Sequence, residues 1–226
     1  MKVRLKGEEL PERLADRIMG LSKPHPIRVG IDGVDGAGKT VLADNLVEPL
    51  RRRGRCVIRA SIDGFHNPRE KRYAKGRHSP EGYFRDSFDL GTVVSGLLQP
   101  LGPDGSLLFR RASFDCGTDS CASSPVEKAS PNAVLLFDGV FLHRRELLGY
   151  WDMTIFLDAP FEVTVRRMAN RDGRPSRIDA VENARYVNGQ KLYLRECRPK
   201  SLATVVVDYT NLERPILFGE GLASSM

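Results

Sequence analysis

Residues 33–40 read Gly33-Val34-Asp35-Gly36-Ala37-Gly38-Lys39-Thr40 and match the pattern G-x-x-x-x-G-K-[ST] in full. Glycines let backbone N–H groups curl around phosphate oxygens, and the start of a following helix adds positive potential. In such a loop, Lys39 reaches the β- and γ-phosphates of a nucleotide and the Thr40 hydroxyl holds Mg²⁺. The stretch therefore predicts a phosphate-binding loop, or P-loop, that binds ATP with Mg²⁺ as cofactor.

The residues on both sides of this loop supply the context that the motif requires. Residues 27–32 form an apolar run typical of a buried strand, and residues 39–53 carry leucines at positions 42, 46 and 50, which is helical spacing. A strand before the glycines and a helix after them separate a true P-loop from a chance match in a turn. Pro49 falls inside the expected helix, and we expect it to bend the last turn.

The rest of the chain alternates strand-like and helix-like patterns. Further strands are expected at 56–62, 133–137, 153–157 and 203–207, and further helices at 87–99, 161–171 and 179–197. Residues 107–114 are expected to be a strand or hairpin arm, and the polar stretches 64–86 and 115–132 to be loops. This alternation predicts an α/β fold, with a parallel sheet flanked by helices and a small β-hairpin and lid region.

The N-terminal segment has a pattern of its own. Leu10, Leu14, Ile18 and Leu21 recur at helical spacing between charged residues, which predicts an amphipathic helix over residues 8–21. A Lys-Pro-His-Pro stretch then breaks the helix. We expect an N-terminal accessory helix, residues 1–26, that docks on the edge of a P-loop domain, residues 27–226.

Composition excludes several classes of partner. Of the 226 residues, 41% are hydrophobic and 28% charged, which is typical of a soluble globular protein. No apolar run approaches the ~20 residues of a membrane span, and the charged N-terminus lacks the apolar core of a signal peptide. We expect a cytoplasmic protein without a membrane partner.

The basic residues and the cysteines are interpreted as structural, without a role in binding nucleic acid or a metal. The net charge is +6, but the arginine run 51–53 falls at the end of an expected helix, where it complements the helix dipole. A nucleic-acid partner is therefore not expected. Neither the four cysteines nor the four histidines are at metal-ligand spacing, and we expect the cysteines to be reduced and structural.

Two aspartates at expected strand ends are candidates for catalysis and metal binding. Asp138 follows the apolar run 133–137, where it can hold Mg²⁺ or a water of the metal's shell. Asp63 ends the strand after the P-loop helix, and the carboxyl ends of parallel strands face the ligand crevice. A carboxylate there can accept the proton of an attacking hydroxyl. The alternative for both aspartates is a turn or helix cap.

Arginines gather around a Gly-Arg-Pro-Ser turn, at positions 166, 167, 171, 174 and 177. Phosphoryl transfer needs positive charge near the transferring group, and a flexible segment can carry it over ATP as a lid. We expect Arg171 and Arg174 to belong to such a lid, and Arg167 to lie on the solvated side of its helix. In the following helix, a stripe formed by Tyr186, Gln190, Tyr193 and Cys197 is interpreted as ordinary core packing.

The chain resembles the uridine kinase and phosphoribulokinase group of P-loop kinases over about residues 27–210. The likeness rests on the P-loop, on Ser61-Ile62-Asp63-Gly64-Phe65-His66, on Asp138-Gly139-Val140 and on Arg171-Asp172. It implies an ATP-dependent kinase that transfers the γ-phosphoryl group to a hydroxyl. It also implies a fold with a five-stranded parallel sheet flanked by helices and a β-hairpin over the acceptor site. It also implies that Asp63 is the catalytic base, that Asp138 is the acidic residue after the third strand, and that Arg171 and Arg174 are lid arginines.

The resemblance favours a nucleoside, uridine or cytidine at its 5′-hydroxyl, as the small-molecule acceptor. Residues 64–86 and 109–119 are then expected to line the pocket, with a carboxylate for the ribose diol and an aromatic ring for the base. The expected substrate residues are His66, Tyr83, Asp86, Asp89 and Phe114. Phe114 and Asp119 stand where uridine–cytidine kinases carry the Tyr and His that read the pyrimidine, so we expect weak selectivity among bases.

Two alternatives remain open from the residues. The same chemistry could act on a sugar or on pantothenate, whose carboxylate Arg69, Arg77 or Arg110 could bind. A regulatory nucleotide switch is an alternative of another class, and the chain has no guanine-reading Asn-Lys-x-Asp segment to favour it. The sequence leaves a homo-oligomer open.

Overall fold

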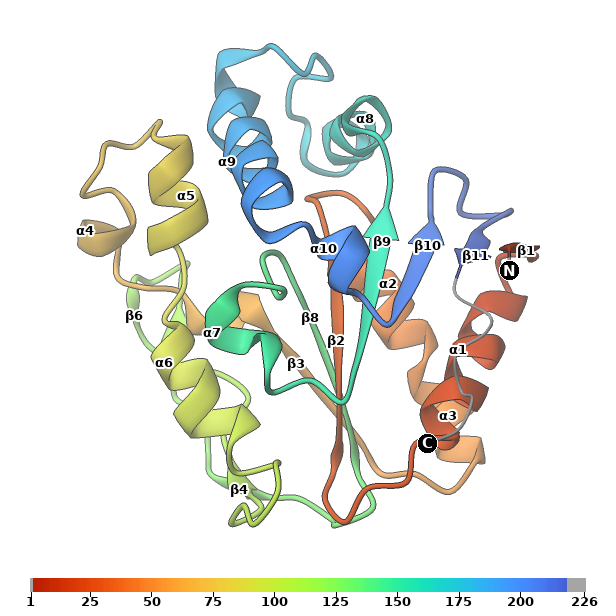
Figure 1. Cartoon of the computed structure of the whole chain (residues 1–226). Coiled ribbons are helices and arrows are strands. Elements are labelled where there is room, and N and C mark those ends of the chain that lie inside the picture. The colour runs from red at the N-terminus through yellow and green to blue at the C-terminus, as the bar shows by residue number, and fades with distance from the viewer. Residues whose placement is uncertain (1, 219–226) are drawn as a thin grey trace.

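In a computed structural model that describes residues 2–218, seven strands form one sheet in the order β1-β11-β10-β9-β2-β8-β3 (Figure 1). In that order, their bounds are Lys2–Arg4, Ile216–Phe218, Val205–Asp208, Met153–Asp158, Ile27–Gly33, Val134–Gly139 and Val57–Ser61. Adjacent strands from β10 to β3 are parallel, which makes five parallel strands with β2 at the centre. The predicted α/β fold with a parallel sheet is confirmed.

The edge of the sheet was not predicted. β11 pairs antiparallel with β10, and β1 pairs antiparallel with β11, so that the two ends of the described chain lie side by side. Each of these strands has three residues, which is too short for an alternating pattern to stand out in the sequence.

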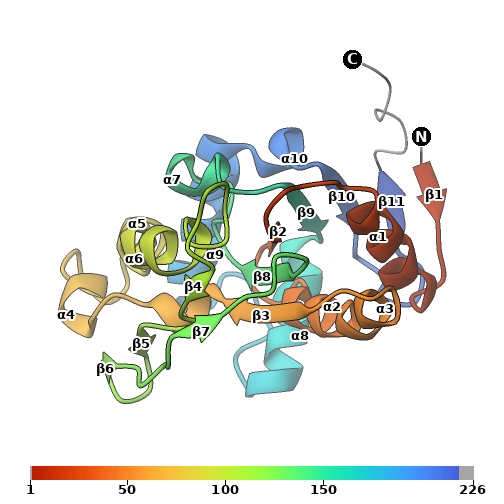
Figure 2. The same cartoon turned by 90° about the horizontal axis from the view of Figure 1, so that it is seen from below.

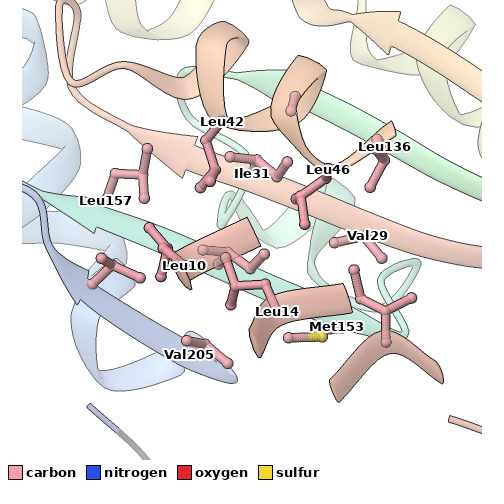
Figure 3. Packing of buried hydrophobic residues seen from close by; sticks show 14 of the residues in the cluster. Leu10, Leu14, Val29, Ile31, Leu42, Leu46, Leu136, Met153, Leu157 and Val205 are labelled. Carbon is pink, nitrogen blue, oxygen red and sulfur yellow. The ribbon is translucent and has the colours of Figure 1, made fainter. Parts of the chain in front are cut away.

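One face of the sheet is covered by α1 (Glu9–Met19), α2 (Lys39–Asn45) and α3 (Val47–Arg52). Leu10 and Leu14 of α1 belong to the same core cluster as Ile31 of β2 and Leu42 of α2 (Figure 3), and all four side chains are fully buried. The N-terminal helix thus contributes to the core of the sheet itself. The division of the chain at residue 26 stays a prediction.

The helix after the P-loop is interrupted, with Leu46 alone between α2 and α3. The cause is Pro49, which has no N–H to donate to the Asn45 carbonyl one turn earlier and whose ring crowds it. The predicted bend therefore exists, but it lies one turn before the proline.

The opposite face is covered by helices that follow β3 in the chain (Figure 2). They are α5 (Pro80–Asp86), α6 (Leu90–Val93) with its continuation Val94–Leu98, α7 (Arg145–Leu148), α9 (Val181–Cys197) and α10 (Pro199–Leu202). A second apolar core lies beneath them and includes Phe65, Phe137, Phe141 and Tyr193. Helix α8 (Phe161–Asp172) lies at the P-loop end of the sheet (Figure 1).

Two predicted loops carry regular structure instead. Residues 64–86 contain the end of a 3-10 turn (Ile62–Phe65), α4 (Arg69–Arg72) and α5. The start of α5 was readable from the sequence, because Ser79 accepts a hydrogen bond from the Gly82 N–H and Pro80 occupies the first turn.

Residues 115–132 were likewise expected to form a loop, and the structure corrects this. Two short antiparallel pairs form there, β4 (Leu108–Phe109) with β7 (Glu127–Lys128) and β5 (Phe114–Asp115) with β6 (Ser120–Cys121). Arg111 and Glu127 join the arms through a forked ion pair at 2.6 and 2.7 Å. The small hairpin region that the sequence predicts is therefore present, with its second arms inside the supposed loop.

Candidate active site

The P-loop connects the carboxyl end of β2 to the start of α2. Gly36 and Gly38 adopt positive φ angles of 74° and 99°, which residues with a side chain rarely adopt. A Cβ at Gly36 would lie 2.4 Å from the Thr164 carbonyl oxygen, so α8 packs directly on the loop. Glycine is therefore required for two reasons: Gly36 and Gly38 need positive φ angles, and α8 approaches Gly36 closely.

Thr40 and Asp138 meet at the end of the central strands. The Thr40 hydroxyl donates a hydrogen bond to Asp138 Oδ2 over 2.7 Å, and the Arg59 guanidinium donates to Asp138 Oδ1 over 2.9 Å. Hydroxyl and carboxylate oxygens are the ligands that Mg²⁺ prefers, so this pair fits a magnesium ion. Arg59 was not singled out in the sequence, because only the pairing of β3 with β8 brings it beside Asp138.

Lys39, Asp63 and Asp138 line one cavity of about 230 Å³ at the carboxyl ends of β2, β3 and β8. Its wall also includes Gly36, Thr40 and the two predicted lid arginines. The Lys39 ammonium donates to the Val34 carbonyl over 2.9 Å, within the loop that phosphates would enter. Groups spread over more than a hundred residues of sequence therefore converge on one hollow.

Asp63 follows β3 in the 3-10 turn and faces the cavity. Its side chain is open to that hollow, but the surrounding protein removes much of its hydration and raises the pKa of the carboxyl, while His66 and Lys39 act in the opposite direction. An ionised carboxylate with a raised pKa is a better proton acceptor than an ordinary aspartate.

His66 stands beside Asp63 in the same cavity. Its Nδ1–H donates to the Asp63 carbonyl oxygen over 2.9 Å, which leaves Nε2 unengaged by that bond. Burial lowers the pKa of His66, which favours the neutral form of the ring. Its ring centroid lies 4.6 Å from that of Phe88, which lines the cavity but was not among the predicted substrate residues.

The predicted lid arginines reach the cavity from the end of α8. Arg171 forms a fork with Asp172 at 2.6 and 2.8 Å, and the Arg174 guanidinium lies 4.9 Å from the centre of the Tyr186 ring. Gly173 ends the helix with a positive φ of 68°. The structure places both arginines in the wall of the cavity, and their contact with phosphate and the closing motion stay predictions.

Of the predicted substrate residues, His66 and Tyr83 line the cavity and the other three do not. Asp86 pairs with Lys75 at 3.0 Å, and Asp89 caps α6 by accepting the Thr92 N–H at 3.1 Å. Phe114 is buried in the β5–β6 hairpin. The structure therefore gives these three side chains other partners, and we assign no acceptor contact to them.

A hydrogen-bond clamp on Asp35 was missed in the sequence. Gln190 accepts from the Asp35 N–H and donates to the Asp35 carboxylate, both over 2.8 Å, and the Tyr83 hydroxyl donates to the same carboxylate over 2.7 Å. Burial raises the pKa of Tyr83 well above its usual range, so it remains a donor. The stripe on α9 is thus more than core packing, and the polar Gln190 within it was the available signal.

A second buried network holds the base of the P-loop. Asp32, the penultimate residue of β2, accepts the Gly33 N–H over 2.7 Å and His143 Nδ1–H over 2.6 Å. The Tyr193 hydroxyl also donates to Asp32, so α9 is tied to the loop at a second point. Removal of these partners would leave a buried carboxylate unpaired, which is strongly destabilising.

Arg167 does not lie free on the solvated side of α8, as the sequence suggested. Its guanidinium donates to the carbonyl oxygens of Tyr209 and Thr210 over 2.9 and 3.0 Å, and to that of Ala37 over 3.4 Å. It therefore joins α8 to the P-loop and to the residues that follow β10. Solvated helix positions and such backbone contacts cannot be distinguished by spacing alone.

Comparisons with known proteins find relatives that are named uridine kinases. The chain is 29% identical to a uridine kinase of Leuconostoc citreum over 158 residues, covering 68% of this chain and 70% of that protein. It is 26% identical over 148 residues to a uridine kinase of Ligilactobacillus salivarius, covering 65% and 67% of the two chains. No family model matches the sequence.

The solved structures extend the likeness to the whole fold. A possible uridine kinase from Bacillus stearothermophilus superimposes with a TM-score of 0.70 at 25% identity, covering 88% of this chain and 98% of that one. The chain is similar to uridine kinases and has the P-loop kinase fold. Phosphoribulokinase from Rhodobacter spheroides shares the fold, with a TM-score of 0.54 and 19% identity over 84% of this chain and 74% of that one.

Within residues 2–218, the uridine kinase-like chain has no helix long and apolar enough to cross a membrane.

Proposed function

We propose that this protein is an ATP-dependent kinase that transfers the γ-phosphoryl group to a hydroxyl of a small molecule, with uridine or cytidine as the leading acceptor. The observation that carries the proposal is the single cavity shared by Lys39, the Thr40–Asp138 pair and Asp63. A phosphate-binding loop alone suits many nucleotide-binding proteins, but a carboxylate with a raised pKa opposite it suits transfer to a hydroxyl.

Each group has a separate task in the proposed reaction. Lys39 would exchange the Val34 carbonyl for phosphate oxygens, and the Asp35 clamp would hold the loop in shape for them. Mg²⁺, held by Thr40 and Asp138, would neutralise the phosphate charge. Asp63 would orient the acceptor hydroxyl and accept its proton as the new oxygen–phosphorus bond forms and the bond from the γ-phosphorus to the bridging oxygen breaks, which releases ADP.

The lid arginines would complete the site as transfer proceeds. The Arg171 side chain is 70% exposed and can move toward the transferring group without losing buried contacts, whereas Arg174 would leave the Tyr186 ring as it moves. Guanidinium groups provide planar, bidentate contacts to phosphate oxygens. We propose that their closure places positive charge beside the phosphoryl group where its charge is largest.

The character of the cavity favours a nucleoside over pantothenate. His66, Phe88 and Tyr186 present ring surfaces to it, as a planar base requires, and relatives in the comparisons are named uridine kinases. Arg69, Arg77 and Arg110, the candidate partners of a pantothenate carboxylate, do not line it. Asp119 is engaged by Arg72 and by the Arg69 N–H, both over 2.9 Å, which supports weak selectivity among bases.

The test is ADP release with uridine, cytidine, adenosine and pantothenate as separate acceptors. Asp63→Asn should still bind ATP, but its kcat should fall by a factor of ~10²–10⁴ because the proton acceptor is lost. The matched control is Asp86→Asn, which lies outside the cavity and should keep kcat and KM within about twofold. Turnover of pantothenate alone would reject the nucleoside, and a loss below tenfold in Asp63→Asn would reject the base.

A further inference from the structure

A second, larger cavity lies away from the catalytic one. It has a volume of about 820 Å³, against about 230 Å³ at the P-loop, and is formed by the end of α5, by α7, by the end of α9 and by α10. These elements lie together on one face of the sheet (Figure 1). We call it the α7–α10 cavity. Its size is within the ~300–1,000 Å³ of ordinary small-molecule sites.

The wall of this cavity carries an excess of positive charge. It contains Arg85, Arg144, Arg145 and Arg198, but only the two carboxylates Glu146 and Glu196. Both carboxylates are already paired, Glu146 with Arg144 and Glu196 with Arg85 at 2.9 Å. Among the described residues, Arg145 and Arg198 have no side-chain partner, so the excess charge faces an open hollow.

The floor contributes a buried polar atom that lacks a partner. His143 lines the cavity and its side chain is fully buried, yet its Nε2 makes no hydrogen bond within residues 2–218. The other ring nitrogen is committed to Asp32. A buried, unpaired polar atom costs free energy unless a ligand or water satisfies it. Phe84, Leu148 and Leu202 supply apolar surface in the same wall.

We propose that the α7–α10 cavity binds a small organic anion, a phosphate monoester with an apolar group, and that its occupancy changes the affinity of the P-loop for ATP. Arg145 and Arg198 contact the phosphate, and Phe84, Leu148 and Leu202 contact the apolar group. This site is separate from the acceptor site, and its existence does not depend on which acceptor the enzyme uses.

Two short routes connect the cavity to the P-loop. Through one, His143 holds Asp32, which accepts the Gly33 N–H at the start of the loop. Through the other, α9 carries Glu196 and Cys197 in the cavity wall and Gln190 on the Asp35 clamp, all in one rigid helix. A ligand that moves His143 or the end of α9 therefore acts on both anchors of the loop.

Phenyl phosphate is the probe for binding, and the histidine ring signals in NMR spectra are the readout. A nonhydrolysable ATP analogue with Mg²⁺ is kept at saturation, so that the probe cannot enter the P-loop. We expect a saturable shift of the His143 signals, and no shift of that kind with phenol, which lacks the charge. The absence of a saturable shift up to about 10 mM probe, or an equal shift with phenol, would overturn the site.

Variants then assign the contact. Arg145→Gln and Arg198→Gln should each raise the Kd of the probe about three- to tenfold, because a charge-assisted hydrogen bond at an exposed residue is lost. Arg13→Gln on α1 changes the net charge equally and should leave the Kd unchanged. Equal weakening in all three variants would mean only non-specific attraction by a basic protein.

Coupling is measured as the change in the Kd of the ATP analogue when phenyl phosphate is added. If the change arises in the α7–α10 cavity, Arg198→Gln should raise the probe concentration that gives half of the change about three- to tenfold. If that concentration is the same in Arg198→Gln as in the native protein, the probe competes directly at the P-loop, and the coupling is refuted. An unchanged Kd in the native protein at saturating probe would refute it as well.

Discussion

Leu14→Ala should lower the stability of the whole protein, although Leu14 lies in the segment that the sequence sets apart as accessory. Its side chain is fully buried against the sheet on the face shown in Figure 3. Substitution removes three buried carbons at about 0.8 kcal/mol each and leaves a cavity, which together cost about 3 kcal/mol. Alanine is a good helix former, so none of this loss comes from helix propensity.

The single tryptophan provides the assay. Trp151 packs on Gly30 and Phe137 on the opposite face of the sheet from α1, so its fluorescence reports on the core that Leu14 does not touch. In urea, the Trp151 midpoint should fall by about 1 M, since slopes for small proteins are about 1–3 kcal/mol/M and rise with size. Leu108→Ala is the control, because Leu108 is 49% exposed, and it should cost under about 1 kcal/mol.

One result would refute this reasoning. If far-UV circular dichroism of Leu14→Ala showed early loss of helix while the Trp151 midpoint stayed unchanged, α1 would unfold independently of the sheet. The division at residue 26 would then describe a real boundary. A common shift of both signals would instead show that residues 1–26 belong to one cooperative unit with the rest of the chain.

Three further predictions concern the active site. The midpoint of the acid limb of kcat/KM should lie above pH ~3.9, the ordinary aspartate pKa, because Asp63 must be ionised and its pKa is raised. A pH–rate profile whose acid limb has its midpoint at or below that value would contradict this. Gln190→Leu should raise the KM for ATP about tenfold, because Asp35 loses a donor and an acceptor, whereas Gln99→Leu, away from the P-loop, should not. Trypsin cleavage within 171–177 should slow when a nonhydrolysable ATP analogue and acceptor are added, and equal rates would argue against a closing lid.

The sequence alone was sufficient for the parts of the site that depend on local order. The P-loop is contiguous, so strand, glycines, lysine and helix all appear within residues 27–53. Asp63 and Asp138 could be placed because each follows an apolar strand, and the carboxyl ends of parallel strands meet at one edge. The capping roles of Ser79 and Asp89 were also local and could have been read, since each binds an N–H three residues later.

The contacts that hold the loop in shape depend on the tertiary structure. Gln190 meets Asp35 across 155 residues of sequence, and Tyr193 meets Asp32 across 161. Helical spacing predicts which face of α9 is buried, but it does not say which strand end that face meets. The same limit applies to Arg59 and Arg167, whose partners lie on other elements. Side-chain hydrogen bonds need atoms within about 3 Å, and only the packing of helices on the sheet determines distances between remote segments that closely.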